Sequence, residues 1–461
     1  MLIGANGTGK SQVLELVTKL FNVLIASQEK GIKVQRYEHD FVLDYQIDGK
    51  KAQIRSVKNF ETYLLNGNSV DFKDMPTPGK ILASAINLND RFPFYTKRSK
   101  LSNYLGIRTA SNNAFKNHNT LIDRFSSSLY KHENIARYKT VFDRIGLLPE
   151  ISVIYKVGKN LGIAKKDSSR EYLYDSGLLK AKFSEVIDKL DTQNRFLIRR
   201  DKYSRVISEQ NNLDIITNFF KAKRNKITTE KRFIEYDSLA NFDNELEVKE
   251  FINEAKALQL IRDLELLEVH KLILRRKSGK YGFDQGSSGE HHILSNFINI
   301  IYAIEPNSLV MIDEPEISLH PNWQIQYMSL LQKAFSDYTD CHFIISTHSH
   351  FLVSDLIPEK SAVLSFHLDD LGSVYNETLL FETNGWSTEN VLYRVFGVGT
   401  VRNHYLEMDL RELLSKISDD SHEFVRMREI VTSLQRFKLT DDDPLVKIIE
   451  TAQHYLEKHG Y

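Results

Sequence analysis

Eight residues near the start of the chain combine glycines, a lysine and a serine in a spacing that suits phosphate binding. They read Gly4-Ala5-Asn6-Gly7-Thr8-Gly9-Lys10-Ser11. Glycines let the backbone turn its N–H groups towards an anion, and the helix that follows adds the positive end of its dipole. Lys10 supplies a charge for the β- and γ-phosphates, and Ser11 an oxygen ligand for Mg²⁺. The pattern predicts an ATP site that uses Gly4, Asn6, Gly7, Thr8, Gly9, Lys10 and Ser11.

Two acidic residues follow an apolar run much later in the chain. The run Leu309-Val310-Met311-Ile312 has the composition of a central parallel strand, and it ends at Asp313-Glu314-Pro315. Ligands of open α/β sheets bind at the carboxyl ends of the strands. We therefore expect Asp313 to hold Mg²⁺ and Glu314 to act as the general base that polarises the attacking water.

A second apolar run, residues 342–345, leads to Ser346-Thr347-His348. His348 follows Asp313 by 35 residues, about one helix and one strand, so we expect it at the same sheet edge. An imidazole there can hydrogen-bond the γ-phosphate and sense its loss, which predicts a catalytic role. Other histidines lack this position and are predicted to be structural or interfacial: His291, His292, His320 and His350.

These motifs, with Gln285-Gly286-Ser287-Ser288-Gly289-Glu290, occur in the order found in ABC-class ATPases. The last segment resembles the signature sequence of that class, except that Gln285-Gly286 stands where a leucine usually precedes the first serine. The resemblance implies that Ser287, Ser288, Gly289 and Glu290 contact the γ-phosphate bound to a partner subunit. Residues 316–321 would then be the D-loop that touches the partner. Two copies must therefore meet to hydrolyse ATP.

The residues around the motifs resemble one branch of this class. Residues 313–324 and 346–352 are similar to RecF/OLD-related ATPases of the AAA type, a soluble branch that includes DNA repair and anti-phage ATPases. Residues 89–93, 104–108 and the tail after Trp386 resemble the ATPase subunit of Septu defence systems. The resemblance implies a homodimer or higher oligomer that controls a separate nuclease effector, for example of the HNH type.

The chain departs from the OLD nucleases, which carry acidic metal ligands in a Toprim domain after the switch histidine. Here Asp369-Asp370 stands alone in a turn, and Asp441-Asp442-Asp443 suits a helix cap. Asn117-His118-Asn119 has no metal-ligand partners in the sequence. We therefore predict no nuclease activity in this chain.

The predicted fold class is α/β, an ABC-type P-loop ATPase head with a helical insertion and a helical C-terminal tail. Apolar residues from Val13 to Leu24 recur at helical spacing, strands are expected around the Asp48-Gly49 turn and at residues 81–86, and Pro444 opens a tail helix. The expected domains are an N-terminal lobe (1–112), a mostly helical insertion (113–256), a C-terminal lobe with the signature, Walker B and switch histidine (257–385), and a helical tail (386–461). Only three residues precede Gly4, so we expect that this form lacks N-terminal strands usual in the class.

Composition limits the partners. Lys plus Arg and Asp plus Glu number 61 each, so no global field attracts nucleic acid or membrane. The single cysteine indicates a reducing compartment, and the sequence lacks both a run of 18 apolar residues and a signal peptide. These features predict a cytoplasmic protein without a membrane partner.

One local window is basic. Between Arg195 and Arg232, eleven Lys/Arg stand against four Asp/Glu, with Phe196, Tyr203, Phe219 and Phe220 among them. Two interpretations remain open: a solvated helical face over core aromatics, and a site for non-specific nucleic acid.

We expect a Mg²⁺-dependent ATPase whose dimerisation gates an effector in phage defence. An ATPase of DNA repair or chromosome maintenance that acts directly on DNA is the main alternative, although residues 113–256 show no sustained heptads. A transporter subunit fits the Asp-Glu-Pro-Glu and Ser-Leu-His-Pro sequences poorly. A fourth hypothesis, a sensor that binds ATP as a structural switch, fits the intact Glu314 less well.

Overall fold

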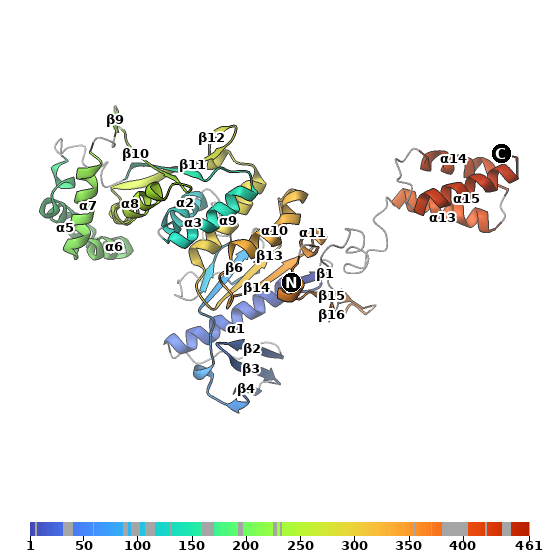
Figure 1. The fold of residues 1–461 in the computed structure, drawn as a ribbon. Coiled ribbons are helices and arrows are strands. Elements are labelled where there is room, and N and C mark those ends of the chain that lie inside the picture. The colour runs from blue at the N-terminus through green and yellow to red at the C-terminus, as the bar shows by residue number, and fades with distance from the viewer. Residues whose placement is uncertain are drawn as a thin grey trace. The chain divides into compact units, whose positions relative to one another are not determined.

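The computed structural model describes residues 1–4, 7–30, 40–58, 60–85, 91–93, 102–106, 116–129, 131–158, 170–191, 197–224, 228–230, 233–354, 356–369, 371–379, 404–419, 422–435 and 444–460. The chain divides into two compact units, Met1–Trp386 and Ser387–Tyr461. Figure 1 shows the elements of both, and each unit is described by itself.

A seven-stranded sheet forms the centre of the first unit, in the order β16-β15-β1-β14-β13-β6-β7. All neighbouring strands are parallel except the edge pair β15 and β16. Every residue of β13 is buried, as expected of a strand covered on both faces. The strands are β1 (Leu2–Gly4), β6 (Lys80–Ala85), β7 (Ser102–Tyr104), β13 (Ser308–Asp313), β14 (His342–Thr347), β15 (Leu364–Leu368) and β16 (Val374–Thr378).

Helix α1 (Lys10–Lys30) lies between this sheet and a smaller antiparallel one (Figure 1). Its residues Leu14, Phe21 and Leu24 are buried in a cluster that includes residues of both sheets. The expected hairpin at Asp48-Gly49 is confirmed, and both residues have the positive φ of a tight turn. The small sheet consists of β2 (Phe41–Ile47), β3 (Lys50–Val57), β4 (Phe60–Leu65) and β5 (Asn68–Ser69).

Three further helices follow the site motifs: α9 (Ser288–Ala303), α10 (Pro321–Ala334) and the short α11 (His350–Val353). Asn296 of α9 accepts a hydrogen bond from Ser84 of β6 (3.0 Å) and donates one to the Tyr327 hydroxyl of α10 (2.6 Å). A buried amide with partners on two elements fixes the helix against the sheet.

The predicted helical insertion is present, but between residues 150 and 241 it also contributes strands that the sequence did not reveal. The strand at residues 267–276 follows the insertion, where the sequence predicts a strand over 266–275. The helices of the insertion are α2 (Lys116–Ser128), α3 (His132–Arg144), α5 (Ser176–Asp191), α6 (Leu197–Ile207), α7 (Gln210–Ala222) and α8 (Glu245–Asp263). A five-stranded sheet, in the order β12-β11-β8-β10-β9, lies beside them. The strands are β8 (Glu150–Val157), β9 (Thr228–Glu230), β10 (Phe233–Asn241), β11 (Leu267–Arg276) and β12 (Gly279–Gly282).

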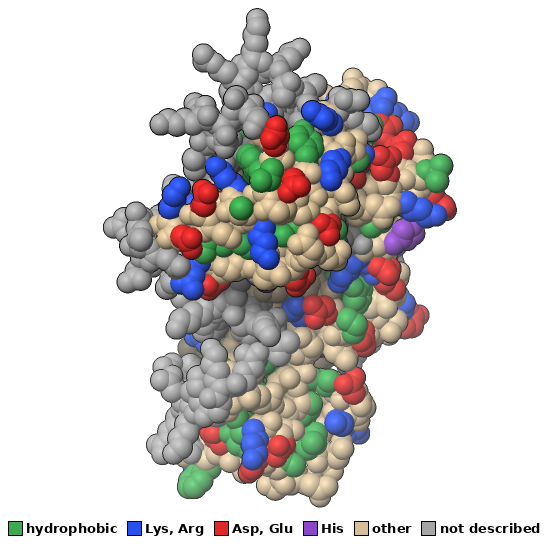
Figure 2. Space-filling view, turned by 90° about the vertical axis from the view of Figure 1, so that its left-hand side faces the viewer, with side chains coloured by type: hydrophobic (Ala, Val, Ile, Leu, Met, Phe, Trp, Pro, Cys, Tyr) green, Lys and Arg blue, Asp and Glu red, His purple; other side chains and the backbone are tan. Residues whose placement is uncertain are grey.

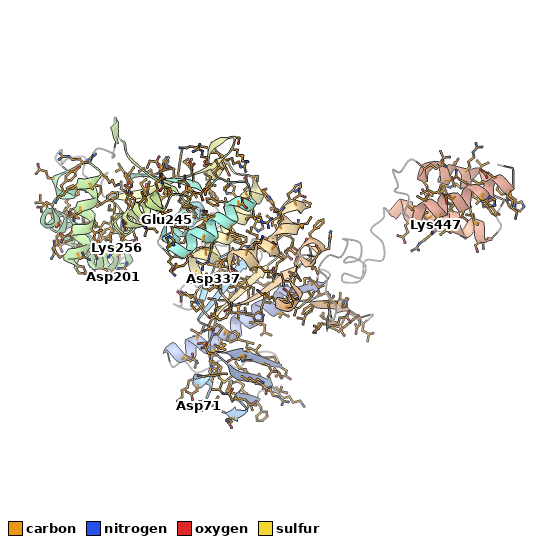
Figure 3. All side chains as sticks on the ribbon, in the orientation of Figure 1. Asp71, Asp201, Glu245, Lys256, Asp337 and Lys447 are labelled. Carbon is orange, nitrogen blue, oxygen red and sulfur yellow. The ribbon has the colours of Figure 1, made fainter. Side chains whose placement is uncertain are left out.

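One ion pair connects the insertion to the head. Arg137 of α3 is buried and forms an ion pair with Asp337, which follows α10 and is labelled in Figure 3. Its guanidinium also lies 4.8 Å from the centroid of the Tyr338 ring. Helix α3 is thereby held against the helix that follows the Asp313-Glu314 motif.

The second unit is a group of three helices with its own core, so the helical tail is confirmed. The helices are α13 (His404–Ser418), α14 (Phe424–Leu434) and α15 (Pro444–Lys458). Leu413, Met427 and Ala452 are fully buried among them. Pro444 opens α15, where its fixed φ suits the first helical position. Within the described residues of both units, no helix has the length and apolarity to cross a membrane.

Candidate functional site

The site lies at the carboxyl edge of the central sheet, where strands distant in sequence are neighbours. Asp313 of β13 pairs in register with Ser346 of β14, and β1, which leads into the phosphate loop, lies on the other side of β14. The Ser11 hydroxyl donates a 3.0 Å hydrogen bond to Asp313 Oδ1, across 302 residues of sequence. The Ser346 hydroxyl donates to the same oxygen. The two residues predicted to hold Mg²⁺ are therefore together.

The pair of oxygen donors fits a magnesium ion. Mg²⁺ prefers oxygen ligands and commonly takes only one or two from the protein, with waters and phosphates completing the shell. Ser11 Oγ and Asp313 Oδ1 are ligands of this kind. Among the residues described, no group of three or more His, Cys, Asp or Glu forms a metal site, and this chemistry does not require one.

Lys10 is buried inside the phosphate loop. Its Nζ donates to the carbonyl oxygen of Gly4 at 2.9 Å and lies 3.4 Å from Thr8 Oγ1. Burial lowers the pKa of Lys10, while the charges of Glu314, Asp313 and Glu316 raise it. Gly7 and Gly9 adopt φ of 83° and 87°, which favours glycine. Asn6, also predicted to bind nucleotide, lies outside the described residues.

Glu314 and His348 face each other. His348 Nε2 lies 3.5 Å from Glu314 Oε1. Burial raises the pKa of Glu314, as do the charges of Asp313 and Glu316, whereas Lys10 lowers it. Burial and the charge of Lys10 lower the pKa of His348, which favours a neutral imidazole. The arrangement joins a carboxylate of increased basicity to a neutral hydrogen-bonding ring.

Two residues whose contacts were not predicted from the sequence, Glu316 and Gln324, hold the turn formed by His348 and Ser349. Glu316 Oε1 accepts a 2.7 Å hydrogen bond from the backbone N–H of His348. Gln324 of α10 donates to the Leu319 carbonyl (2.9 Å) and accepts from the Ser349 hydroxyl (2.6 Å). Residues 316–321, expected to be the D-loop, are thus connected to the end of β14 by these hydrogen bonds. An acid directly after Asp-Glu-Pro was the only sequence signal for this contact.

The signature segment begins α9 with two exposed and two buried residues. Ser287 and Ser288 are exposed, whereas Gly289 and Glu290 are buried. Ser287 Oγ accepts from the Glu290 N–H (3.3 Å), and the Glu290 carboxylate accepts from the Ser287 N–H (2.8 Å), which forms a capping box. A Cβ on Gly289 would lie 2.6 Å from the Trp323 ring. Among the residues that the structure describes, no hydrogen bond or ion pair joins this turn to the phosphate loop.

The basic window forms part of α6 and α7, and several of its charges are matched by acids from outside the window. Arg199 pairs with Glu265, and Lys202 and Arg205 with Asp263, while Lys223 pairs with Glu250 and Glu254. Figure 2 looks at this side of the first unit and shows blue and red side chains intermixed.

The aromatics of the window are core residues where they are described. Tyr203, Phe219 and Phe220 are all buried, and Phe196 lies outside the described residues. Buried rings cannot serve as stacking platforms for bases. These observations favour the solvated helical face over a nucleic-acid site.

Comparison with known proteins extends the assignment beyond single motifs. The family described as AAA ATPase domain matches residues 1–353, most of the chain. The chain belongs to this AAA ATPase family. The match includes the phosphate loop, the Asp313-Glu314 motif and His348, and ATP is the substrate expected of such a domain.

Two relatives of this AAA ATPase come from retrons. It is 21% identical over 408 residues to the Retron Vc95 probable ATPase of Vibrio cholerae serotype O1 biovar El Tor, covering 79% of this chain and 68% of that protein. It is 24% identical over 379 residues to the Retron Ec83 probable ATPase of Escherichia coli, covering 76% and 64% respectively. The chain thus spans about two thirds of the length of these relatives.

Among solved structures, the Smc head domain of Pyrococcus furiosus matches 82% of this chain and 89% of its own, at 12% identity and a TM-score of 0.29. At this identity and TM-score, the likeness supports no functional inference.

Proposed function

We propose that this AAA ATPase hydrolyses ATP with Mg²⁺ at composite sites between two copies of the chain arranged head to tail. The observation that carries the proposal is the division of the motif residues into two groups. Ser11, Asp313, Glu314 and His348 lie together at one sheet edge, while Ser287 and Ser288 are exposed at the start of α9, where Ser287 bonds Glu290. A second copy would bring its serine turn to the nucleotide.

The residues would share the reaction as follows. Lys10, the loop amides and the turn of the second copy hold the phosphates, and Ser11 and Asp313 hold Mg²⁺, which supplies positive charge for the phosphate oxygens. Glu314 accepts the proton of the water that attacks the γ-phosphorus, and ADP and phosphate leave. His348 hydrogen-bonds the γ-phosphate. Its backbone N–H donates to Glu316, so a movement of His348 on phosphate loss would move residues 316–321.

We further propose that the ATP-driven change controls a separate nuclease in anti-phage defence. The two retron ATPase relatives support the defence context, and so does the resemblance to RecF/OLD-related and Septu ATPases. This chain would act as the regulator without nuclease activity of its own. The division into 1–112, 113–256, 257–385 and 386–461 belongs to the same proposal, with the tail as a candidate contact for the effector.

The test is the mass of Glu314→Gln by light scattering, with and without ATP and Mg²⁺. The variant should bind ATP, turn over at least about 100-fold more slowly than wild type, and double in mass only with nucleotide, because loss of the base stalls the closed state. Lys10→Ala should bind no ATP and keep the mass of the nucleotide-free form. A wild-type rate in Glu314→Gln would remove Glu314 as the base. A mass that ATP does not change would contradict the composite site.

A further inference from the structure

The carboxylate of Glu290 connects the signature turn to a neighbouring hairpin. Glu290 is only 3% exposed, and its Oε2 accepts from the Ser287 N–H at 2.8 Å. A buried carboxylate is costly unless a positive group and hydrogen bonds compensate it. The positive group that compensates the Glu290 charge comes from outside α9.

Arg276, the last residue of β11, is the positive group. It forms an ion pair with Glu290 Oε1, and its guanidinium lies 4.8 Å from the centroid of the Tyr281 ring in β12. The Tyr281 hydroxyl lies 3.5 Å from the same carboxylate oxygen. One face of the hairpin therefore presents a stacked arginine and a tyrosine to the acid that closes the cap.

The position of Arg276 is fixed by the five-stranded sheet. Arg276 pairs with Gly279 across the hairpin, and residues 267–274 of β11 pair with β8. The sheet in turn packs against helices of the insertion, since α2 and α8 both contact β11. A shift of the sheet would move the guanidinium, and with it the carboxylate that sets the serine turn.

We propose that Arg276 is a positioning residue for the signature turn, which holds Ser287 and Ser288 so that they reach ATP bound to a second copy. This inference rests on the proposed composite site. Arg276 acts through Glu290 and touches no nucleotide itself. Its loss should impair the serine face of a subunit and leave the phosphate-loop face of the same subunit working.

The test is ATPase activity in mixtures of variants. Arg276→Ala alone should hydrolyse ATP on the order of 10–100-fold more slowly, the usual cost of a misplaced contact group. Mixed with Lys10→Ala it should recover activity, because one composite site then combines an intact phosphate loop with an intact serine turn. Mixed with Ser288→Arg it should gain no activity over Arg276→Ala alone, because both variants damage the same face. General destabilisation would not produce this dependence on the partner.

Matched variants sharpen the test. Arg275→Ala, one residue earlier, removes an ion pair with Glu150 instead, and should keep activity within about twofold of wild type. Glu290→Gln keeps an amide oxygen for the cap but loses the ion pair, so it should copy Arg276→Ala, and the double variant should be no worse than either single one. Arg276→Lys keeps the charge without the planar guanidinium, and should show the same pairing pattern with a smaller loss.

The outcomes distinguish the positioning role of Arg276 from the proposed composite site on which it rests. ATP binding to Arg276→Ala, followed with a fluorescent ATP analogue, should equal that of wild type, which confirms the fold. If Lys10→Ala and Ser288→Arg fail to complement each other, the composite site is wrong and the inference falls with it. If they complement, but Arg276→Ala is fully active or complements Ser288→Arg, the inference alone is overturned.

Discussion

At the scale of single residues, Glu314 has a left-handed backbone conformation that few residues other than glycine adopt. Its φ is 50°, and its N–H donates to the Ser346 carbonyl at 3.0 Å. Non-glycine residues in this region cost about 1–3 kcal/mol and persist only where the surroundings hold them. Here the turn directs the Glu314 carboxylate beside Asp313 and His348, and burial, followed by the nearby like charges, raises its pKa and makes it a better proton acceptor.

The rate of hydrolysis should therefore fall in acid as Glu314 takes up a proton. Its pKa is raised, so activity is present above that value and is lost as the pH falls through it. Glu316→Gln removes one of the charges that raise this pKa, and keeps an oxygen for the His348 N–H. The acid limb of the kcat profile should move to lower pH in this variant.

The control for this shift is Glu305→Gln. Glu305 lies in the loop before β13, and its carboxylate pairs with Lys80. Its acid limb should match that of wild type. An unchanged limb in Glu316→Gln, or a limb moved to higher pH, would contradict the assignment of Glu314 as the titrating base.

At the scale of elements, the start of α9 is packed against the start of α10. Gly289 leaves room for the Trp323 ring and for the carbonyl of Ser318, which itself adopts a φ of 64°. The signature turn and residues 316–320 thus share a surface within one subunit. The glycine that the sequence suggested as a phosphate contact also has a packing role.

Gly289→Ala should destabilise the first unit by about 1–3 kcal/mol, because the new methyl group would lie 2.6 Å from the half-buried Trp323 ring and 3.1 Å from the Ser318 carbonyl oxygen. The midpoint of urea unfolding measures this loss. Gly286→Ala is the matched control, since Gly286 has φ of −67° and no atom closer than 3.3 Å to the added Cβ. Equal midpoints for the two variants would show that Trp323 moves without cost.

At the scale of the whole molecule, the chain consists of two units with separate cores. The core of the second unit contains residues of α13, α14 and α15. A substitution that destabilises this core should therefore unfold the second unit without unfolding the first, because residues that share a core unfold together.

Leu413→Ala should destabilise the second unit by about 2–5 kcal/mol, since Leu413 is fully buried. Faster amide exchange should appear in α13–α15, with ATP binding by the first unit unchanged. Leu414→Ala, at a neighbour that is 46% exposed, should change the free energy of unfolding by less than about 0.5 kcal/mol. Loss of ATP binding in Leu413→Ala would show that the two units unfold together.

The sequence predicted the motif-bearing elements best, because phosphate chemistry fixes both residue types and spacing. The helix after the phosphate loop, β6, β13 and β14 all lie where expected. Strand β8 was missed because Ile151 to Tyr155 is a short apolar run inside a helical window, and such runs fit a strand or a buried helix equally. Its pairing with β11 joins segments more than 100 residues apart, which local pattern cannot reveal.

The site was predicted as separate motifs, without the contacts between them. Ser346 reaches Asp313 through the register of two strands, and no spacing rule gives that register. Arg276 stands in an Arg-Arg-Lys turn that looks like ordinary solvated surface. Its role follows only from the burial of Glu290, a residue that the sequence placed on the nucleotide.

The position of β1 has a consequence for synthesis on the ribosome. This strand lies between β14 and β15, so its two neighbours are translated only after residue 341. At about 5–20 residues per second, the phosphate loop waits on the order of tens of seconds for the strands that frame it. During that time the side of α1 that packs on the central sheet lacks β13, β14 and β15, although the small sheet β2–β5 is already translated. A nascent chain stalled before residue 342 should not retain ATP, so nucleotide capture reports that translation of the head is complete.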